Sequence, residues 1–311
     1  MNIYLAPLEG ITNNIFRSAQ YKYFGGVDKY FTPFITPTDN GRLSTKITRD
    51  ILPDNNKGQL LVPQILTNSS EGFLTMCKTL NSCGYTEFNL NLGCPSGTVV
   101  SKGRGAGFLS YTDKLEIFLD EIFKSDFKIS IKTRIGLTSP DEFYKLLEIY
   151  NKYPLTELII HPRTKQDMYN NKPNWEIYKY ACENTNHKLC YNGNIFTFSD
   201  YIEFTKAFPN TENIMLGRGI VTNPALPLII KNTGELTLES LKAFYKEIYT
   251  DYENILSGSV PLLHKMKELT LYLAELFNDN TKIVKKIKKA KSIRDFNSAV
   301  AELFSSYELK K

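Results

Sequence analysis

Cys94 is a side chain that could donate a proton near neutral pH. It follows an alternating polar and apolar stretch, residues 89–92, and it opens a segment of glycines, small polar residues and cations that ends at Gly107. A thiol with a pKa of about 8.5 is mostly protonated at pH 7, yet it can release its proton to a developing anion. A buried thiol without chemistry is the alternative that residue type leaves open.

Lys132 and His161 each stand at the end of an apolar stretch, in SIKTRIG and LIIHPRT. Considered singly, either could be a surface side chain without a task. The stretches YNGNI (191–195) and MLGRGI (215–220) are either tight turns or a phosphate cradle. Glycines let backbone N–H groups approach a phosphate, and an arginine adds a bidentate charge. A lysine and a histidine that converge on a phosphate would indicate a charged, ring-bearing cofactor.

Eight short apolar, β-branched or aromatic stretches must position these side chains. They lie near residues 4, 33, 63, 89, 131, 160, 190 and 215. Segments of helical period separate most of them, at 15–20, 71–80, 112–123, 140–151, 174–182 and 198–207. Eight βα units predict a TIM (β/α)8 barrel, an α/β fold, because an open doubly wound sheet more often has five to seven strands.

In a barrel the carboxyl ends of the strands share one rim, and active sites form there. The rim is therefore expected to carry Pro7, Gln64, Asn91, Cys94, Lys132, His161, Asn192 and Arg218. The spacing between the fourth and fifth strands is longer than the others, which places an insertion around Cys94 at this rim.

From about residue 236 the strand signals stop and helical patterns take over, which divides the chain into a barrel domain, 1–235, and a small all-helical domain, 236–311. The stretch 282–294 contains seven cations and no anion: Lys282, Lys285, Lys286, Lys288, Lys289, Lys291 and Arg294. Such a run is either a solvated helix face or a contact for a phosphate backbone.

Composition bounds the class of protein. The chain has 311 residues, 42% of them hydrophobic, and a net charge of +5, less than a protein that only coats nucleic acid would need. Five cysteines without a CxxC pair indicate neither a disulfide framework nor a metal site. The start lacks a signal peptide and no window reaches the length of a membrane helix, so we expect a cytoplasmic protein, and we expect it to be a monomer.

The motifs resemble those of the tRNA-dihydrouridine synthases (Dus), which are FMN-dependent TIM barrels with a C-terminal helical domain. The resemblance spans nearly the whole chain and rests on APLEGITNNIFR, NLNLGCPSGTVVSKGRGAGFL, IKTRIG, HPRTKQDMY with a downstream NW, YNGNI and LGRGIVTNP. The HPRTK motif, with Tyr169 and the NW pair, is similar to the bacterial C-type subgroup.

Carried over by position, the resemblance implies sites for FMN, for NADPH as a transient reductant, and for tRNA. The FMN contacts would be Pro7, Leu8, Glu9, Gln64, Lys132, His161, Asn192, Gly193, Asn194, Gly217 and Arg218. Cys94 would be the catalytic proton donor, on a mobile loop. The contacts to the uridine and the rest of the tRNA would be Asn91, Arg134, Tyr169, Lys265 and Lys267, with the cations of 282–294 as a further clamp.

The implied reaction reduces the 5,6 double bond of a uracil, which needs a hydride at C6 and a proton at C5. Reduced FMN would supply the hydride, Cys94 the proton from the opposite side, and Lys132 would stabilise the anionic reduced ring. A uridine in folded tRNA must first flip out, at a cost of a few kcal/mol.

Three positions depart from the family pattern: Asn13, often acidic there, Pro162, often glycine, and Ile220, often alanine. Two other functions stay open. One is another FMN barrel oxidoreductase that acts on a free pyrimidine, which the cationic helical region disfavours. The other is a non-catalytic RNA-binding barrel, which the presence of Cys94, Lys132 and His161 disfavours.

Overall fold

A parallel sheet forms the centre of the computed structural model, which describes residues 1–38 and 41–310. Its order is β3-β2-β1-β9-β8-β7-β6-β5-β4. The strands are β1 (Asn2–Leu5), β2 (Lys29–Phe31), β3 (Leu61–Val62), β4 (Gln64–Ile65), β5 (Glu87–Leu92), β6 (Lys128–Arg134), β7 (Leu158–His161), β8 (Leu189–Tyr191) and β9 (Asn213–Leu216).

Pro63 explains why nine strands make an eight-stranded barrel. It lies between β3 and β4, and because it has no N–H it interrupts the ladder within one extended stretch. β3 pairs with β2 and β4 pairs with β5, so the two ends of the sheet order are halves of one strand and the sheet closes. The predicted TIM barrel is confirmed, with a strand at or near each predicted stretch.

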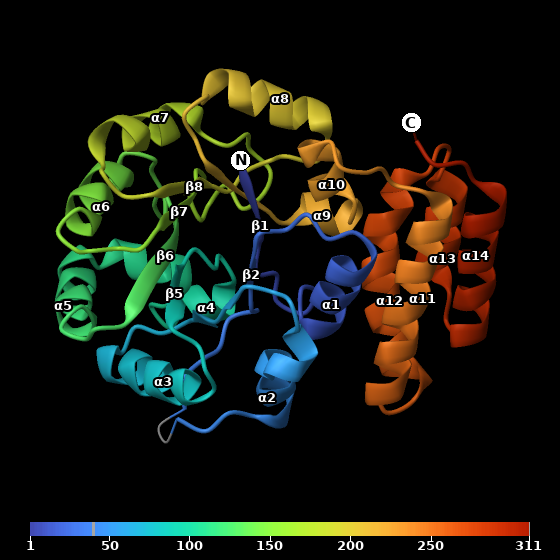
Figure 1. Ribbon diagram of the computed structural model, residues 1–311, viewed down its shortest axis with the longest axis horizontal. Coiled ribbons are helices and arrows are strands. Elements are labelled where there is room, and N and C mark those ends of the chain that lie inside the picture. The colour runs from blue at the N-terminus through green and yellow to red at the C-terminus, as the bar shows by residue number, and fades with distance from the viewer. Residues whose placement is uncertain (39–40, 311) are drawn as a thin grey trace.

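Helices surround the sheet (Figure 1). The longer ones are α1 (Asn14–Tyr23), α3 (Ser70–Ser82), α5 (Thr112–Ile122), α6 (Glu142–Tyr150), α7 (Trp175–Asn184) and α8 (Phe198–Ala207), and each matches a predicted segment. The sequence did not predict α2 (Thr45–Ile51), α4 (Gly97–Val100), α9 (Arg218–Thr222) or α10 (Leu226–Lys231). These helices have at most two turns, too few for an apolar period to repeat.

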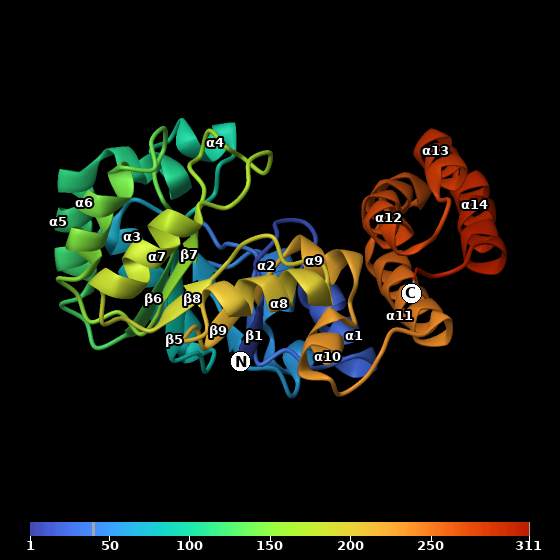
Figure 2. The same cartoon turned by 90° about the horizontal axis from the view of Figure 1, so that it is seen from above.

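Four helices follow the barrel: α11 (Leu238–Ile255), α12 (Ser259–Leu273), α13 (Thr281–Lys289) and α14 (Ile293–Ser306). They stand beside the barrel, with α11 and α12 nearer to it than α13 and α14 (Figure 2). The Phe244 ring of α11 lies 5.7 Å from Phe16 and 5.5 Å from Phe24, centroid to centroid. Apolar packing therefore continues from α1 into the helical region, and the domain boundary at residue 235 stays a prediction.

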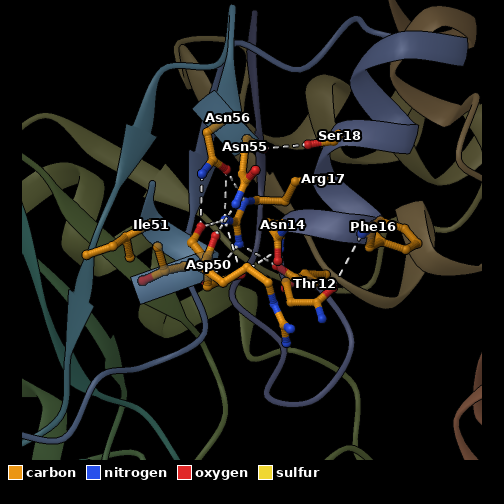
Figure 3. Close-up of polar contacts among 12 residues, drawn as sticks. Thr12, Asn14, Phe16, Arg17, Ser18, Asp50, Ile51, Asn55 and Asn56 are labelled. Atoms are coloured by element: carbon orange, nitrogen blue, oxygen red, sulfur yellow. Dashed lines mark hydrogen bonds and ion pairs between the residues drawn. The ribbon is translucent and has the colours of Figure 1, made fainter. Parts of the chain in front are cut away.

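A buried polar network holds the loop between β1 and α1 from within (Figure 3). The guanidinium of Arg17 donates to the carbonyl of Thr12 at 2.8 Å and forms an ion pair with Asp50 at 3.3 Å. It also donates to the side chain of Asn56 at 2.9 Å. Because a buried cation is costly unless it is paired and hydrogen-bonded, these partners fix α1 against α2.

Among the described residues, no helix combines the length and the hydropathy needed to cross a membrane. The expectations of a cytoplasmic location and of a monomer stay predictions.

Candidate active site

A cavity of about 450 Å³ opens at the carboxyl ends of the barrel strands, a volume in the usual range for small-molecule sites. The residues predicted to bind FMN, to donate the proton or to face the uridine all lie in its wall. From the first half of the chain these are Pro7, Leu8, Glu9, Gln64, Asn91, Cys94, Lys132 and Arg134. From the second half they are His161, Tyr169, Asn192, Gly193, Asn194, Gly217 and Arg218.

Asn91 fixes the position of Cys94. Its side-chain oxygen accepts the backbone N–H of Gly93 at 3.0 Å and that of Cys94 at 2.9 Å. Its side-chain nitrogen donates to Gln64 Oε1 at 2.6 Å, which uses one of the two amide hydrogens. Asn91 therefore holds the cysteine and keeps one N–H for a molecule in the cavity.

The bond from Asn91 to Gln64 belongs to a chain of buried polar side chains across three strands. Gln64 donates to Asn89 at 2.8 Å, and Asn89 donates to Ser130 at 2.9 Å. All three are fully buried. Since a buried amide left without a partner is costly, each member restricts the rotamer of the next.

The glycines after Cys94 let the chain fold back tightly onto it. Gly105 has a φ of +55°, and a Cβ there would lie 2.8 Å from the Cys94 carbonyl oxygen. A Cβ on Gly107 would lie 2.7 Å from the carbonyl oxygen of Val100. The N–H of Ala106 donates to the Cys94 carbonyl at 3.0 Å. Residues 105–109 are buried. This part of the segment therefore packs against the backbone of Cys94.

The cavity keeps the Cys94 thiol protonated. Burial raises its pKa, and a hydrogen bond from the Ser96 backbone, together with the charges of Arg134 and Lys132, offsets only part of that shift. Burial lowers the pKa of Lys132 to about 8, and the positive charge of Arg134 adds to this effect. At pH 7 the site therefore presents a neutral thiol and an ammonium group that is still mostly charged.

Arg134 joins two loops around the cavity. Its Nε donates to the Gly93 carbonyl at 3.0 Å, and its Nη1 donates to the carbonyls of Thr164 at 2.7 Å and Met168 at 3.0 Å. Its guanidinium also lies 5.5 Å from the centre of the Tyr169 ring. Arg134 therefore ties the cysteine end of β5 to the loop after β7, in addition to any contact with substrate.

His161 is held neutral by its surroundings. Burial lowers its pKa well below the usual value, and the charges of Arg134, Lys132, Arg163 and Arg218 lower it further. Arg163 Nη1 lies 3.0 Å from His161 Nε2. Because a guanidinium can only donate, Nε2 accepts and Nδ1 carries the proton.

Arg163 is a residue that the sequence analysis missed. It is 1% exposed and lies in the cavity wall. Its Nε donates to the Asn171 carbonyl at 2.6 Å, whereas its buried Nη2 has no hydrogen-bond partner in the described part of the chain. A buried donor without a partner is suited to an anionic or carbonyl oxygen of a ligand. The signal was present, since Arg163 belongs to the HPRT motif.

The loops after β8 and β9 bring backbone close to the cavity. A Cβ on Gly193 would lie 2.0 Å from the Tyr191 hydroxyl, and a Cβ on Gly219 would lie 2.2 Å from the Ile195 carbonyl. Arg218 Nη2 donates to Asn194 Oδ1 at 3.2 Å. The Arg218 guanidinium also lies 4.6 Å from the centre of the Tyr169 ring and 5.2 Å from that of Phe196. Glycine is thus required by steric contact in the loop after β8 and in the first turn of α9.

The helical region also reaches the cavity, which the sequence analysis did not foresee. Tyr272, on α12, lies in the cavity wall. Burial raises the pKa of its hydroxyl, and Arg218 lies near enough to oppose that shift. A single tyrosine on a helix far along the chain from the barrel strands gives no sequence signal for such a contact.

Lys265 and Lys267 lie outside the cavity wall, and their ammonium groups contact the protein. Lys265 Nζ donates to the carbonyl of Gly10 and contacts Glu268 at 3.0 Å. Lys267 Nζ donates to the carbonyls of Ala290 and, at 3.2 Å, of Lys288 at the end of α13. Both lysines thus have structural partners within the chain.

With this geometry in place, comparison with known proteins identifies the family. The family model "Dihydrouridine synthase (Dus)" matches residues 4–308. The chain belongs to the dihydrouridine synthase family. The family predicted from the motifs is therefore confirmed.

Relatives within this family differ in how much of the chain they match. A tRNA-dihydrouridine(16) synthase of Shigella flexneri is 23% identical and aligns over 96% of this chain and 98% of its own length. One of Pseudomonas putida is 29% identical over 74% of this chain and 73% of its own. A probable tRNA-dihydrouridine synthase of Staphylococcus epidermidis is 29% identical over 71% of this chain and 69% of its own.

Solved structures share the fold. An old yellow enzyme homologue from Zymomonas mobilis superposes with a TM-score of 0.54 at 9% identity, covering 76% of this chain and 90% of its own. Morphinone reductase gives a TM-score of 0.52 at 10% identity, covering 76% of this chain and 87% of its own. These likenesses bear on the barrel alone.

The three residues that depart from the family pattern lie outside the cavity wall. Asn13 caps α1 by accepting the N–H of Phe16 at 3.4 Å. The Pro162 carbonyl accepts the N–H of Asn174 at 2.7 Å, which closes the loop after His161. Ile220 is fully buried. None of these positions lines the cavity wall, so all three departures leave its described side chains intact.

Proposed function

We propose that this protein is a flavin-dependent tRNA-dihydrouridine synthase, which reduces the 5,6 double bond of specific uridines in tRNA. The observation that carries the proposal is the cavity of a family member in which a protonated Cys94 thiol and the Lys132 ammonium line the same wall. A reduction that adds a hydride and a proton to one double bond needs both an acid and a cation that stabilises developing negative charge.

The cavity residues fit FMN. Lys132, Arg134, Arg163 and Arg218 line it, and among the described lining residues Glu9 is the one carboxylate. The Glu9 carboxylate forms an ion pair with the Lys46 ammonium group at 3.5 Å. The open Nη2 of Arg163 and the glycine backbone of the cavity wall at Gly193 and Gly219 suit an anionic ligand. When bound, FMN supplies the hydride for C6 of the uracil after reduction by NADPH.

Each proposed FMN contact has a physical role. The phosphate would be held at the loops after β8 and β9 by Asn192, Gly193, Asn194, Gly217 and Arg218. Gln64 and Lys132 would meet the polar edge of the ring, with the backbone of Pro7, Leu8 and Glu9 beneath it. His161, neutral and with its proton on Nδ1, would donate one hydrogen bond without adding charge. Lys132 would stabilise the negative charge of the reduced ring.

Cys94 is the proposed proton donor to C5. Its thiol is neutral at pH 7 because burial raises its pKa, and its backbone is fixed by the Asn91 side chain. Asn91 keeps one amide hydrogen for the uracil, and Arg134 and Tyr169 lie beside each other at the same wall. These three residues would orient the base so that C5 faces the thiol.

The proposed tRNA contact lies on α13. Its buried face is formed by Ile283 and Ile287, and the lysines on its other faces are exposed: Lys282, Lys285, Lys286, Lys288 and Lys289. Phosphate contacts of this kind could offset the few kcal/mol needed to flip a uridine out of its stack. Lys286 pairs with Glu302, and the ammonium groups of Lys265 and Lys267 also have protein partners, so these three lysines are weaker candidates than the other four.

Position 16 is the proposed target within tRNA. The relatives from Shigella flexneri and Escherichia coli O157:H7 that align over 96% of the chain, helical region included, are named tRNA-dihydrouridine(16) synthases. Orientation of tRNA over the barrel depends on that helical region, so similarity there bears on the position.

Mapping dihydrouridine in tRNA tests the proposal. Purified protein with FMN and NADPH should convert uridine 16 of unmodified tRNA, and the protein should bind FMN stoichiometrically. Reduction of free uracil or orotate without reduction of tRNA would favour an oxidoreductase for free pyrimidines. Protein that binds tRNA but no flavin would favour a non-catalytic binding barrel.

A further inference from the structure

One face of α12 runs along the loop between β1 and α1 and ends at the cavity. Lys265, Leu269 and Tyr272 are spaced by four and three residues, which places them on the same side of the helix. Leu269 lines a small void together with Ile11, and Tyr272 lies in the cavity wall. The helical region therefore covers the loop, whose residues 6–9 and 11 form part of that wall.

Lys265 makes the polar contact between this face and the loop. Its ammonium group donates to the carbonyl of Gly10 and contacts the Glu268 carboxylate at 3.0 Å. It also lies 5.4 Å from the centre of the Tyr252 ring, and its side chain is only 18% exposed. Gly10 has a φ of +78°, a conformation suited to glycine, which turns its carbonyl towards α12.

A second contact lies next to the first. The Tyr252 hydroxyl of α11 donates to Asn13 Oδ1 at 3.0 Å, and Asn13 caps α1 directly after the loop. On the inner side, Arg17 donates to the Thr12 carbonyl at 2.8 Å. The loop is thus held between the buried Arg17 network of the barrel and two polar contacts from the helical region.

We infer that Lys265 is a positioning residue for the active site: through Gly10, the helical region fixes the loop of residues 7–12 that forms one wall of the cavity. Lys265 acts on the loop and makes no contact of its own with the reacting atoms. The part of this inference that concerns FMN rests on the proposed function, whereas the part that concerns the loop does not.

The contacts favour this role over an RNA clamp. To reach a phosphate, the Lys265 ammonium would have to leave a carbonyl, a carboxylate and an aromatic face that already surround it. A partly buried carbonyl that loses a charged donor also loses a favourable hydrogen bond. Lys267, two residues along the same helix, contacts the end of α13 and not the loop, so it serves as a matched control.

Amide hydrogen exchange and FMN binding test the inference on the full chain. In Lys265→Met, the N–H groups of Ile11 and Thr12, which bond to the Leu8 carbonyl, should exchange about tenfold faster than in the wild type, and the FMN Kd should rise about tenfold. Lys265→Arg should restore most of both, because a guanidinium can still donate to Gly10. Lys267→Met should leave both unchanged.

The outcomes separate this inference from the proposed function. If the wild type binds no FMN, the proposed function fails while exchange at Ile11 and Thr12 still tests the positioning role. If Lys265→Met leaves exchange and FMN binding unchanged, with or without weaker tRNA binding, the inference is wrong. Should Lys265→Met fold poorly, Lys265→Gln keeps a polar side chain that is shorter and uncharged, and unchanged exchange at Ile11 and Thr12 in that variant would count against the inference.

Discussion

The side-chain oxygen of Asn91 accepts the backbone N–H of Cys94 at 2.9 Å. Asn91, near the end of β5, therefore positions the Cys94 thiol. The rotamer of Asn91 is in turn set by a hydrogen bond of 2.6 Å to Gln64 on the neighbouring strand. The proposed acid is therefore fixed by the barrel itself.

Replacing Asn91 should slow the reaction by misplacing the thiol. In Asn91→Ala, the Gly93 and Cys94 N–H groups lose their acceptor, and a shift of about 1 Å at a reacting group can cost on the order of 100-fold in rate. We expect that loss in single-turnover formation of dihydrouridine. Asn184→Ala, at an exposed site at the end of α7, is the control. A wild-type rate in Asn91→Ala would show that Cys94 is positioned by other contacts.

Replacing Cys94 should separate the two halves of the reaction. Cys94→Ala should keep FMN and still oxidise NADPH with another electron acceptor, whereas dihydrouridine formation should fall by about 10²- to 10⁴-fold, the usual contribution of a general acid. The measurement is dihydrouridine in tRNA against NADPH consumption. Cys83→Ala, at an exposed cysteine, should have no effect. Undiminished dihydrouridine formation in Cys94→Ala would rule out its role as the acid.

Lys132 should make the stability of the flavin-free protein depend on pH. Its pKa is lowered to about 8, against about 10.4 in an unfolded chain, so the unfolded state binds more protons between these values. Stability therefore rises with pH through that window, and below pH 8 the full cost of burying the ammonium applies.

Lys132→Met should accordingly stabilise the flavin-free protein at pH 7, by on the order of 2 kcal/mol, and the gain should shrink as the pH rises towards 10. Urea unfolding at pH 7 and pH 9.5 measures both values. Lys128→Met, at the exposed start of the same strand, should show no such dependence. A gain that is the same at both pH values would contradict a lowered pKa at Lys132.

The exposed lysines of α13 should contribute to tRNA affinity through phosphate contacts. A Lys285→Glu, Lys288→Glu, Lys289→Glu triple variant should bind tRNA more weakly and reduce the slope of log K against log salt by roughly 2. Lys114→Glu, Lys145→Glu, Lys179→Glu makes the same charge change on the outer barrel helices and should have a much smaller effect. Equal losses in both variants would indicate a general effect of net charge instead of a contact at α13.

The sequence by itself determined the barrel, the helical character of the C-terminal region and the set of side chains at the rim. Strand and helix alternate along the chain, and parallel strands bring all their carboxyl ends to one side, so Cys94, Lys132 and His161 could be grouped without coordinates. The glycines at 193 and 217 were assigned to the same rim for the same reason. These assignments to one rim depend only on the order of strands and helices along the chain, which the sequence contains.

Only the tertiary structure decided how those side chains are held and charged. The open donor of Arg163, the arrival of Tyr272 in the wall and the contact of Lys265 with Gly10 each join segments far apart in sequence. The raised pKa of Cys94 and the lowered pKa of Lys132 follow from burial among neighbours on other strands. Desolvation and contact are properties of packing, and the order of residues does not contain them.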